Sequence, residues 1–145
     1  MSDLLIKFKI VTPERTVFED EIDQATLPVA DGEVTILPNH RSYIGALKAG
    51  EIFLKKGKGE FNFAVSGGLV EFDKNNLVVL ADTAERAEEI DVKRAEVARA
   101  RAEELKKQRI SVDDSEYARV ASALEKEMAR IKVARKHHSH GMKID

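Results

Sequence analysis

Residues 1 to 81 carry short apolar segments separated by turn residues at intervals of about eight to twelve positions. Ile6, Phe8 and Ile10 alternate with lysines, which predicts a strand with one face turned towards a core. All three prolines and seven of the eight glycines lie in this half, whereas residues 82 to 136 contain neither type. The spacing of apolar segments and turns predicts a sandwich or barrel of antiparallel strands.

Turn residues divide this half into its expected strands. Thr12–Arg15 predicts a turn after the first strand, and Asp31-Gly32 predicts another before the apolar run Glu33–Leu37. Gly67-Gly68 separates two apolar runs, which predicts a β-bulge at this pair. The unbroken apolar run Leu77–Leu80 predicts a strand that is buried on both faces.

After Ala81 the chain consists mainly of Ala, Glu, Lys and Arg, the strong helix formers, with a break at Gln108–Val112 that predicts two helices. The expected packing stripe of the first helix consists of Ala95, Ala98, Ala102 and Leu105. The second helix is expected to start at Asp113 with Glu116 as a capping-box variant, and its stripe consists of Tyr117, Ala121, Leu124, Met128 and Ile131. The two stripes predict an antiparallel hairpin. Because their side chains are small and bury little apolar area, the hairpin is expected to be only weakly stable and able to move.

The predicted fold class is therefore β + α. An N-terminal antiparallel β-sandwich in residues 1–84 is followed by a C-terminal antiparallel two-helix hairpin in residues 85–145. The chain has 145 residues and a net charge of -2, so no chain-wide positive field attracts nucleic acid or an anionic membrane. The first residues lack a signal-peptide pattern and no uncharged stretch is long enough for a membrane span, which favours a cytosolic location.

The sequence offers no set of residues typical of catalysis, so an enzyme is not expected. The run His137-His138-Ser139-His140 is interpreted as a flexible polar tail in preference to a metal site. His40 follows Pro38-Asn39 in a loop and is either a polar turn residue or a partner contact. Residues 128 to 143 hold five cations and no acid, which indicates either a solvated helix end or a patch for an acidic partner.

Several motifs, in this order and spacing, resemble the epsilon subunit of F-type ATP synthases across nearly the whole chain. The motifs are Leu27-Pro28, Asp31-Gly32-Glu33, Ile36–His40, Ala46–Gly50, Val65–Glu71 and Leu80–Ala87. The most specific combination is Ser-Gly-Gly followed by Ala-Asp-Thr-Ala-Glu-Arg. The chain departs from the family's pattern where Thr35 and Asn39 replace glycines; Asn tolerates left-handed backbone, whereas the β-branched Thr35 crowds a close backbone approach.

The resemblance implies a non-catalytic rotor subunit on the cytoplasmic face of the cell inner membrane, bound peripherally without inserting into it. Its sandwich would contact the gamma subunit and the membrane ring of c subunits, with Glu33 and His40 facing the ring and stalk. Its hairpin would extend into the head of catalytic alpha and beta subunits and inhibit ATP hydrolysis. The basic residues expected to enter the head near an acidic loop are Arg130, Lys132, Arg135 and Lys136.

The hexapeptide Ile90–Ala95 is similar to the signature with which some epsilon subunits bind ATP between the folded helices. The positions that would form this site are Glu85, Asp91, Arg94, Ala95, Arg101, Lys126 and Arg130. Arginine side chains suit phosphate oxygens, and carboxylates suit ribose or base donors. The same hexapeptide is also an ordinary helix start. ATP is therefore expected as a regulatory ligand at most, and no cofactor is required.

Two other functions fit the same pattern. A free-standing adapter or chaperone-like module would use the hairpin to grip clients. A stand-alone ATP sensor would use the Asp91 motif without belonging to a larger complex.

Overall fold

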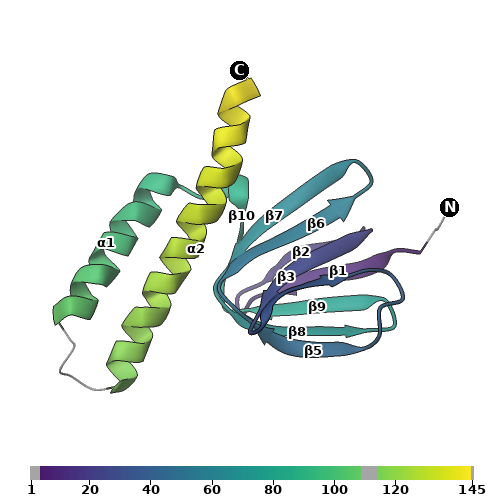
Figure 1. Cartoon of the computed structure of the whole chain (residues 1–145), viewed down its shortest axis with the longest axis horizontal. Helices are drawn as coiled ribbons and strands as arrows, with labels where there is room; N and C mark the ends of the chain where they lie inside the picture. Colours follow the sequence, from purple (N-terminus) through teal and green to yellow (C-terminus); the bar gives the residue numbers. More distant parts are fainter. Residues whose placement is uncertain (1–3, 109–113, 145) are drawn as a thin grey trace.

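The computed structural model describes the backbone of residues 4–108 and 114–144, and the side chains of residues 4–107 and 117–137. Figure 1 shows a β-sandwich with a two-helix hairpin beside it. The strands of the first sheet layer are β3 (Gln24–Val29), β4 (Gly32–Ile36), β6 (Gly50–Lys56), β7 (Gly59–Val65) and β10 (Ala84–Arg86). Those of the second layer are β1 (Ile6–Val11), β2 (Thr16–Ile22), β5 (Tyr43–Leu47), β8 (Gly68–Asp73) and β9 (Asn76–Ala81).

The strands follow the order β10-β7-β6-β3-β5-β8-β9-β1-β2, with β4 paired to β3. A single residue pair, Val29 with Leu47, joins β3 to β5 between the two layers. The described pairs are antiparallel except β1 with β9, which run parallel. The predicted antiparallel sandwich is confirmed, with this one parallel pairing added.

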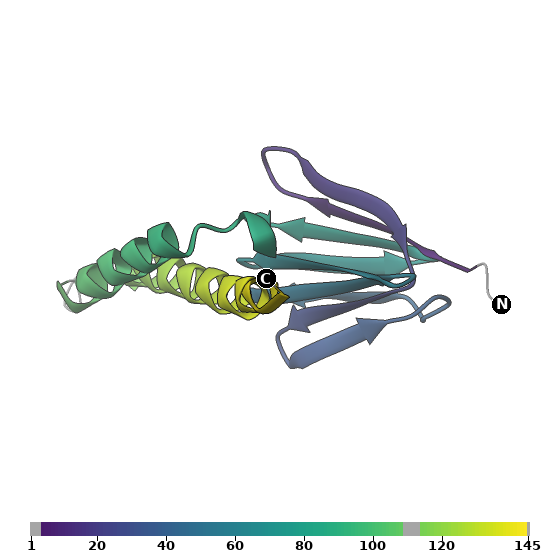
Figure 2. The ribbon, with the colours of Figure 1, turned by 90° about the horizontal axis from the view of Figure 1, so that it is seen from above.

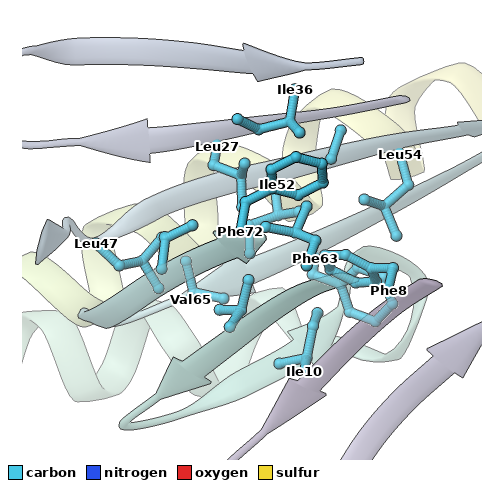
Figure 3. Close-up of a cluster of buried hydrophobic side chains, with 14 of the residues drawn as sticks. Phe8, Ile10, Leu27, Ile36, Leu47, Ile52, Leu54, Phe63, Val65 and Phe72 are labelled. Atoms are coloured by element: carbon cyan, nitrogen blue, oxygen red, sulfur yellow. The ribbon is translucent and has the colours of Figure 1, made fainter. Parts of the chain in front are cut away.

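The core lies between the two layers and is entirely hydrophobic (Figure 3). The predicted inward residues of the first strand, Ile6, Phe8 and Ile10, are all buried. Phe18 of β2 packs against Phe63 of β7, with ring centroids 5.1 Å apart, so the last strand of the order meets the second one across the core. Closing the layers in this way buries apolar surface, which is the main force that stabilises the sandwich.

Two expectations about this half are wrong. The predicted bulge at Gly67-Gly68 is absent from the described register: Gly67 lies in the connection from β7 to β8, and Gly68 is the first residue of β8. A register shift lies instead between Ile10 and Val11. Leu80 is 49% exposed, whereas Leu77 and Val79 are buried, so this strand is buried on one face only. No described residue of this chain forms a layer over its outer face, which the apolar run could not reveal.

The hairpin consists of α1 (Val92–Gln108) and α2 (Asp114–Ile144), which run in opposite directions and pack along their length (Figure 1). In α1, Ala95 and Ala102 of the predicted stripe are buried, and Ala98 and Leu105 are half-buried. In α2 the predicted stripe is only partly correct: Ile131 is buried, but Met128 is 50% exposed. Asp113 lies outside the described residues, as does the Glu116 side chain, so the predicted cap stays a prediction.

The buried face of α2 is shifted from the predicted stripe because this helix packs on two neighbours. Glu127, Ile131 and Ala134 face inward at spacings of four and three, towards α1 and the sandwich. The helix continues through the histidine run to Ile144, and the flexible polar tail expected there stays a prediction. Seen from above, the hairpin occupies one end of the sandwich and the N-terminus the other (Figure 2).

Candidate functional site

The hairpin meets the sandwich through α2, which contacts β6, β7 and the short 3-10 helix η1 (Ala87–Glu89). A small apolar cluster forms the centre of this contact: Ala64, Ala87, Ile90, Val133 and Ala134. Most members are alanine or valine, so the cluster buries little area and supplies a modest hydrophobic free energy. Ion pairs surround it. We call this arrangement, with α2 on the sandwich, the closed state.

Arg130 of α2 lies at the centre of the strongest of these polar contacts. Its guanidinium donates two hydrogen bonds to the Glu85 carboxylate of β10, one of them with Nη2 3.2 Å from Oε2. Its Nη1 donates to Glu127 Oε1 at 2.5 Å. Burial acts to lower the pKa of Arg130, but the hydrogen bonds and charges of Glu85 and Glu127 raise it above its ordinary value. The arginine therefore stays charged between two carboxylates.

The structure brings together some of the residues expected to bind nucleotide. Glu85 and Arg130 are in direct contact. Asp91 sits at the start of α1, where its Oδ1 accepts the Arg94 backbone N–H at 3.1 Å, so it caps the helix. Ala95 is buried in the hairpin seam. The described side chains of Arg94 and Arg101 are exposed, and that of Lys126 is half-buried.

The basic end of α2 is paired with acids from distant parts of the chain. Arg135 contacts Glu96 of α1. Lys136 Nζ lies 3.1 Å from Glu51 Oε1, and His137 Nε2 lies 2.6 Å from Glu51 Oε2. In the closed state these side chains thus have intramolecular partners.

Lys132 lines a groove of about 640 Å³ between α2 and the sandwich, together with Lys48, Ser66 and Met128. No pattern in the sequence indicated Glu51, Glu96 or Glu127 as site residues. The contact with Glu51 spans 85 residues, and no local pattern reports a contact over such a separation.

Two neighbouring residues of α2, Lys136 and His137, contact Glu51. Burial acts to raise the pKa of this carboxyl, but hydrogen bonds from His137 and Lys136, the charge of Lys136 and a hydrogen bond from Asn62 lower it below its ordinary value. Glu51 therefore stays ionised in the closed state at neutral pH.

At the opposite end of the sandwich, His40 lies in a braced loop. The backbone N–H of Asn39 donates to Asn75 Oδ1 at 2.6 Å, and Asn75 Nδ2 donates back to Asn39 Oδ1 at 3.0 Å. Asn39 adopts a φ of 68°, the left-handed geometry that the sequence indicated it would tolerate. His40 Nδ1 donates to the Arg41 carbonyl at 2.7 Å, which fixes its ring.

Two other features of the sandwich are open to solvent. Glu33 is exposed on β4, and the neighbouring Thr35 hydroxyl lies 3.0 Å from that of Thr26. On the outer face of the second layer, Leu69 pairs with both Ala46 and Leu80, and the nearby Ile44 is 67% exposed. These residues form an uncovered apolar stripe across β5, β8 and β9, which is typical of a surface that docks a partner.

Within the part of the chain that the structure describes, no helix combines the length and apolarity needed to cross a membrane. Among the same residues, no three His, Cys, Asp or Glu side chains are grouped so as to hold a metal ion. The His138 and His140 side chains lie outside the described residues.

Fold and site together define a class of protein: a β-sandwich joined to a helical hairpin whose basic second helix is ion-paired to the sandwich. Residues 5–87 match the family model of the ATP synthase delta/epsilon chain β-sandwich domain, and residues 88–135 match that of its long α-helix domain. The chain belongs to the ATP synthase epsilon chain family.

Curated relatives match this chain along nearly its full length. The chain is 47% identical over 128 residues to the ATP synthase epsilon chain of Desulforamulus reducens, covering 88% of this chain and 96% of the relative. It is 44% identical over 135 residues to that of Dehalococcoides mccartyi, covering 93% and 96%.

A solved structure of the Euglena gracilis mitochondrial ATP synthase, described as OSCP/F1/c-ring, contains a chain of similar fold. The TM-score is 0.71 at 19% identity, over 86% of this chain and 78% of that one. A chain of the Tetrahymena thermophila mitochondrial ATP synthase central stalk and c-ring gives a TM-score of 0.56 at 14% identity, over 91% and 95%.

Proposed function

We propose that this protein is a non-catalytic central-stalk subunit that couples the catalytic head of an ATP synthase to its ion-driven membrane ring and restrains ATP hydrolysis through α2. The proposal rests on the contacts that hold the closed state together. Arg130, Arg135 and Lys136 each contact an acid of this chain, around a small apolar centre. Ion pairs of this kind contribute little free energy each. An acidic surface in the head can therefore compete with the acids of this chain for the same basic side chains.

The sandwich supplies two docking surfaces in this proposal. The apolar stripe of Ile44, Leu69 and Leu80 suits the gamma subunit, because covering it removes exposed apolar area from water. The braced loop around His40, with Glu33 on the exposed β4, suits the polar loops of the c ring. A chain held through the ring lies peripherally on the cytoplasmic face of the inner membrane, without inserting into it and without binding nucleic acid.

Neutralising the basic end of α2 tests the inhibitory role. We expect the Gln variant of Lys132, Arg135 and Lys136, with Arg130 kept because it also anchors the closed state, to raise ATP hydrolysis by the assembled complex. Exposed pairs contribute ~0.2 to 1 kcal/mol each, so several lost together at the head weaken the inhibited state by about tenfold. The measurement is steady-state hydrolysis by complexes of equal subunit content. Unchanged hydrolysis would show that these residues are a solvated face.

The variant Glu51→Gln is the matched test in the opposite direction. It removes a negative charge that pairs with α2 in the closed state and leaves the basic residues available to the head, so we expect it to lower hydrolysis. If hydrolysis rose in both variants, this would contradict the idea that the basic side chains of α2 pair either with acids of this chain or with acids of the head. Co-purification from native membranes separates this role from an adapter, which would bring varied clients, and from a sensor, which would come alone.

We propose ATP as a regulatory ligand of the closed state, because Glu85 and Arg130, two of the expected binding positions, are in contact. ATP must then displace carboxylates from Arg130. Ligand should stabilise the hairpin by ~2.7 kcal/mol at a hundredfold excess over the dissociation constant. We expect Arg94→Ala to abolish this shift and Glu127→Gln to strengthen binding, measured by titration calorimetry. Absence of heat at millimolar ATP would exclude the ligand and leave the stalk role intact.

A further inference from the structure

The groove of about 640 Å³ between α2 and the sandwich lies where β5 turns into β6, and we call it the Lys132 groove. The sandwich lines it with residues 47–50 and 66–67. Residues on one face of α2 line the other side: Glu125, Met128, Ala129 and Lys132. Arg130 is not among the lining residues, so the groove is separate from the network of Arg130 with Glu85 and Glu127.

The polar side chains of the Lys132 groove are mainly hydrogen-bond donors. Lys48 and Lys132 are exposed, and neither ammonium group forms an ion pair with a described residue. Ser66 Oγ accepts a hydrogen bond from Thr83 Oγ1 at 2.7 Å, which leaves the Ser66 hydroxyl able to donate to a further acceptor. Glu125 is the one carboxylate among the described lining residues, so two positive charges face one negative charge.

Apolar side chains form much of the remaining wall of the groove. Leu47 lines it from the sandwich, and Met128, which is 50% exposed, lines it from α2. Met128 and Lys132 also line a smaller groove of about 360 Å³ between the two helices, together with Arg99 and Arg135. A small molecule that covers Met128 would therefore remove apolar surface from water beside several basic side chains.

We propose that the Lys132 groove binds a phosphate monoester with an apolar body, and that the bound ligand stabilises the closed state. The ammonium groups of Lys48 and Lys132 complement the nearly double negative charge of such a phosphate. Together with the Ser66 hydroxyl they supply donors for its three terminal oxygens. The apolar body would lie against Met128 and Leu47.

The groove couples ligand binding to the position of the hairpin. Lys48 belongs to the sandwich and Lys132 to α2, so both charges can reach one phosphate only when the hairpin is closed. A ligand that binds the closed state in preference to the open state shifts the equilibrium towards the closed state. This property belongs to the chain by itself and does not depend on the proposed role in an ATP synthase.

Titration of the full chain with naphthyl phosphate, followed through backbone amide chemical shifts, tests the site. We expect the largest shift changes in residues 47–50, 66–67 and 125–132, with a dissociation constant of about 1 mM for a ligand of this size. Inorganic phosphate lacks the apolar body and naphthoate carries a single negative charge, so each should bind at least about fivefold more weakly. With naphthyl phosphate at about ten times its dissociation constant, hydrogen exchange of the amides of residues 131–134 should slow by about tenfold.

Substitutions of exposed side chains decide the outcome. The double variant Lys48→Gln and Lys132→Gln removes both ammonium groups, and we expect it to weaken binding of naphthyl phosphate by about tenfold. Lys55→Gln with Lys58→Gln is the matched control, because it removes the same charge near the other end of β6, and it should keep the affinity. Glu125→Gln removes the opposing carboxylate and should tighten binding by about threefold.

Three results would overturn the proposal. The first is equal affinity for naphthyl phosphate in the two double variants. The second is a set of shift changes confined to the stripe of Ile44, Leu69 and Leu80 or to the Arg130 network, which would place the ligand elsewhere. The third is binding in the groove that leaves the exchange of residues 131–134 unchanged, which would separate the ligand from the closed state.

Discussion

Replacing Gly68 with alanine is expected to destabilise the sandwich by about 3 to 5 kcal/mol, enough to abolish folding in a marginally stable domain. Gly68 adopts a φ of 144°, a region that side chains rarely enter. An added Cβ would lie 1.9 Å from the Leu80 carbonyl oxygen and 2.9 Å from its carbon. Both atoms belong to the backbone of the paired strand β9, so no side-chain rotation relieves the clash.

Gly57→Ala is the matched control for this variant. Gly57 has a φ of 58°, but an added Cβ would meet nothing within 4 Å, so only the backbone cost of about 1 to 2 kcal/mol applies. Urea unfolding followed by circular dichroism gives both values. Equal losses in the two variants would show that backbone conformation alone, without the contact to β9, accounts for the glycine at position 68.

The strands of the sandwich were predictable because a half-buried strand repeats every two residues. Ile6, Phe8 and Ile10 carry that period and are buried as expected. The parallel pairing of β1 with β9 was not predictable, since it joins segments about 70 residues apart and no turn links them. Local patterns indicate the strands, whereas their order depends on contacts that form only in the folded chain.

The prediction that Leu80 is buried within this chain was wrong for a physical reason. An apolar residue on a strand predicts burial, but the sequence does not show whether this chain or a partner covers it. Leu80, Leu69 and Ile44 are exposed in the isolated chain. The docking surface proposed for the gamma subunit would account for their apolar character, because it would bury them in the complex.

The candidate site was only partly visible in the sequence. Glu85 and Arg130 came from the family resemblance, and the structure places them in contact across 45 residues. Glu51 and Glu127 were missed because an acid on a strand or a helix is normally a solvated residue. The basic end of α2 looked unpaired for the same reason: its acids lie elsewhere in the sequence and approach only when the hairpin closes.

Replacing Arg130 with methionine is expected to destabilise the closed hairpin by about 2 to 3 kcal/mol, between the cost of losing an exposed ion pair and that of breaking a buried one. The Arg130 side chain is 20% exposed and serves both Glu85 and Glu127. Methionine keeps much of the volume but leaves two shielded carboxylates facing each other without a cation. We expect α2 to leave the sandwich while the sandwich stays folded, measured as faster hydrogen exchange in residues 117–137 alone.

Two further variants separate lost charge from lost packing in this prediction. Arg135→Met removes a pair whose arginine is 62% exposed, so its cost should not exceed about 1 kcal/mol. Adding Glu85→Gln and Glu127→Gln to Arg130→Met should recover most of the closed state, because a neutral set of this size no longer buries unpaired charge. If Arg130→Met cost no more than Arg135→Met, the network around Arg130 would contribute only as an exposed pair does, and the apolar cluster with Ala134 would hold the hairpin closed.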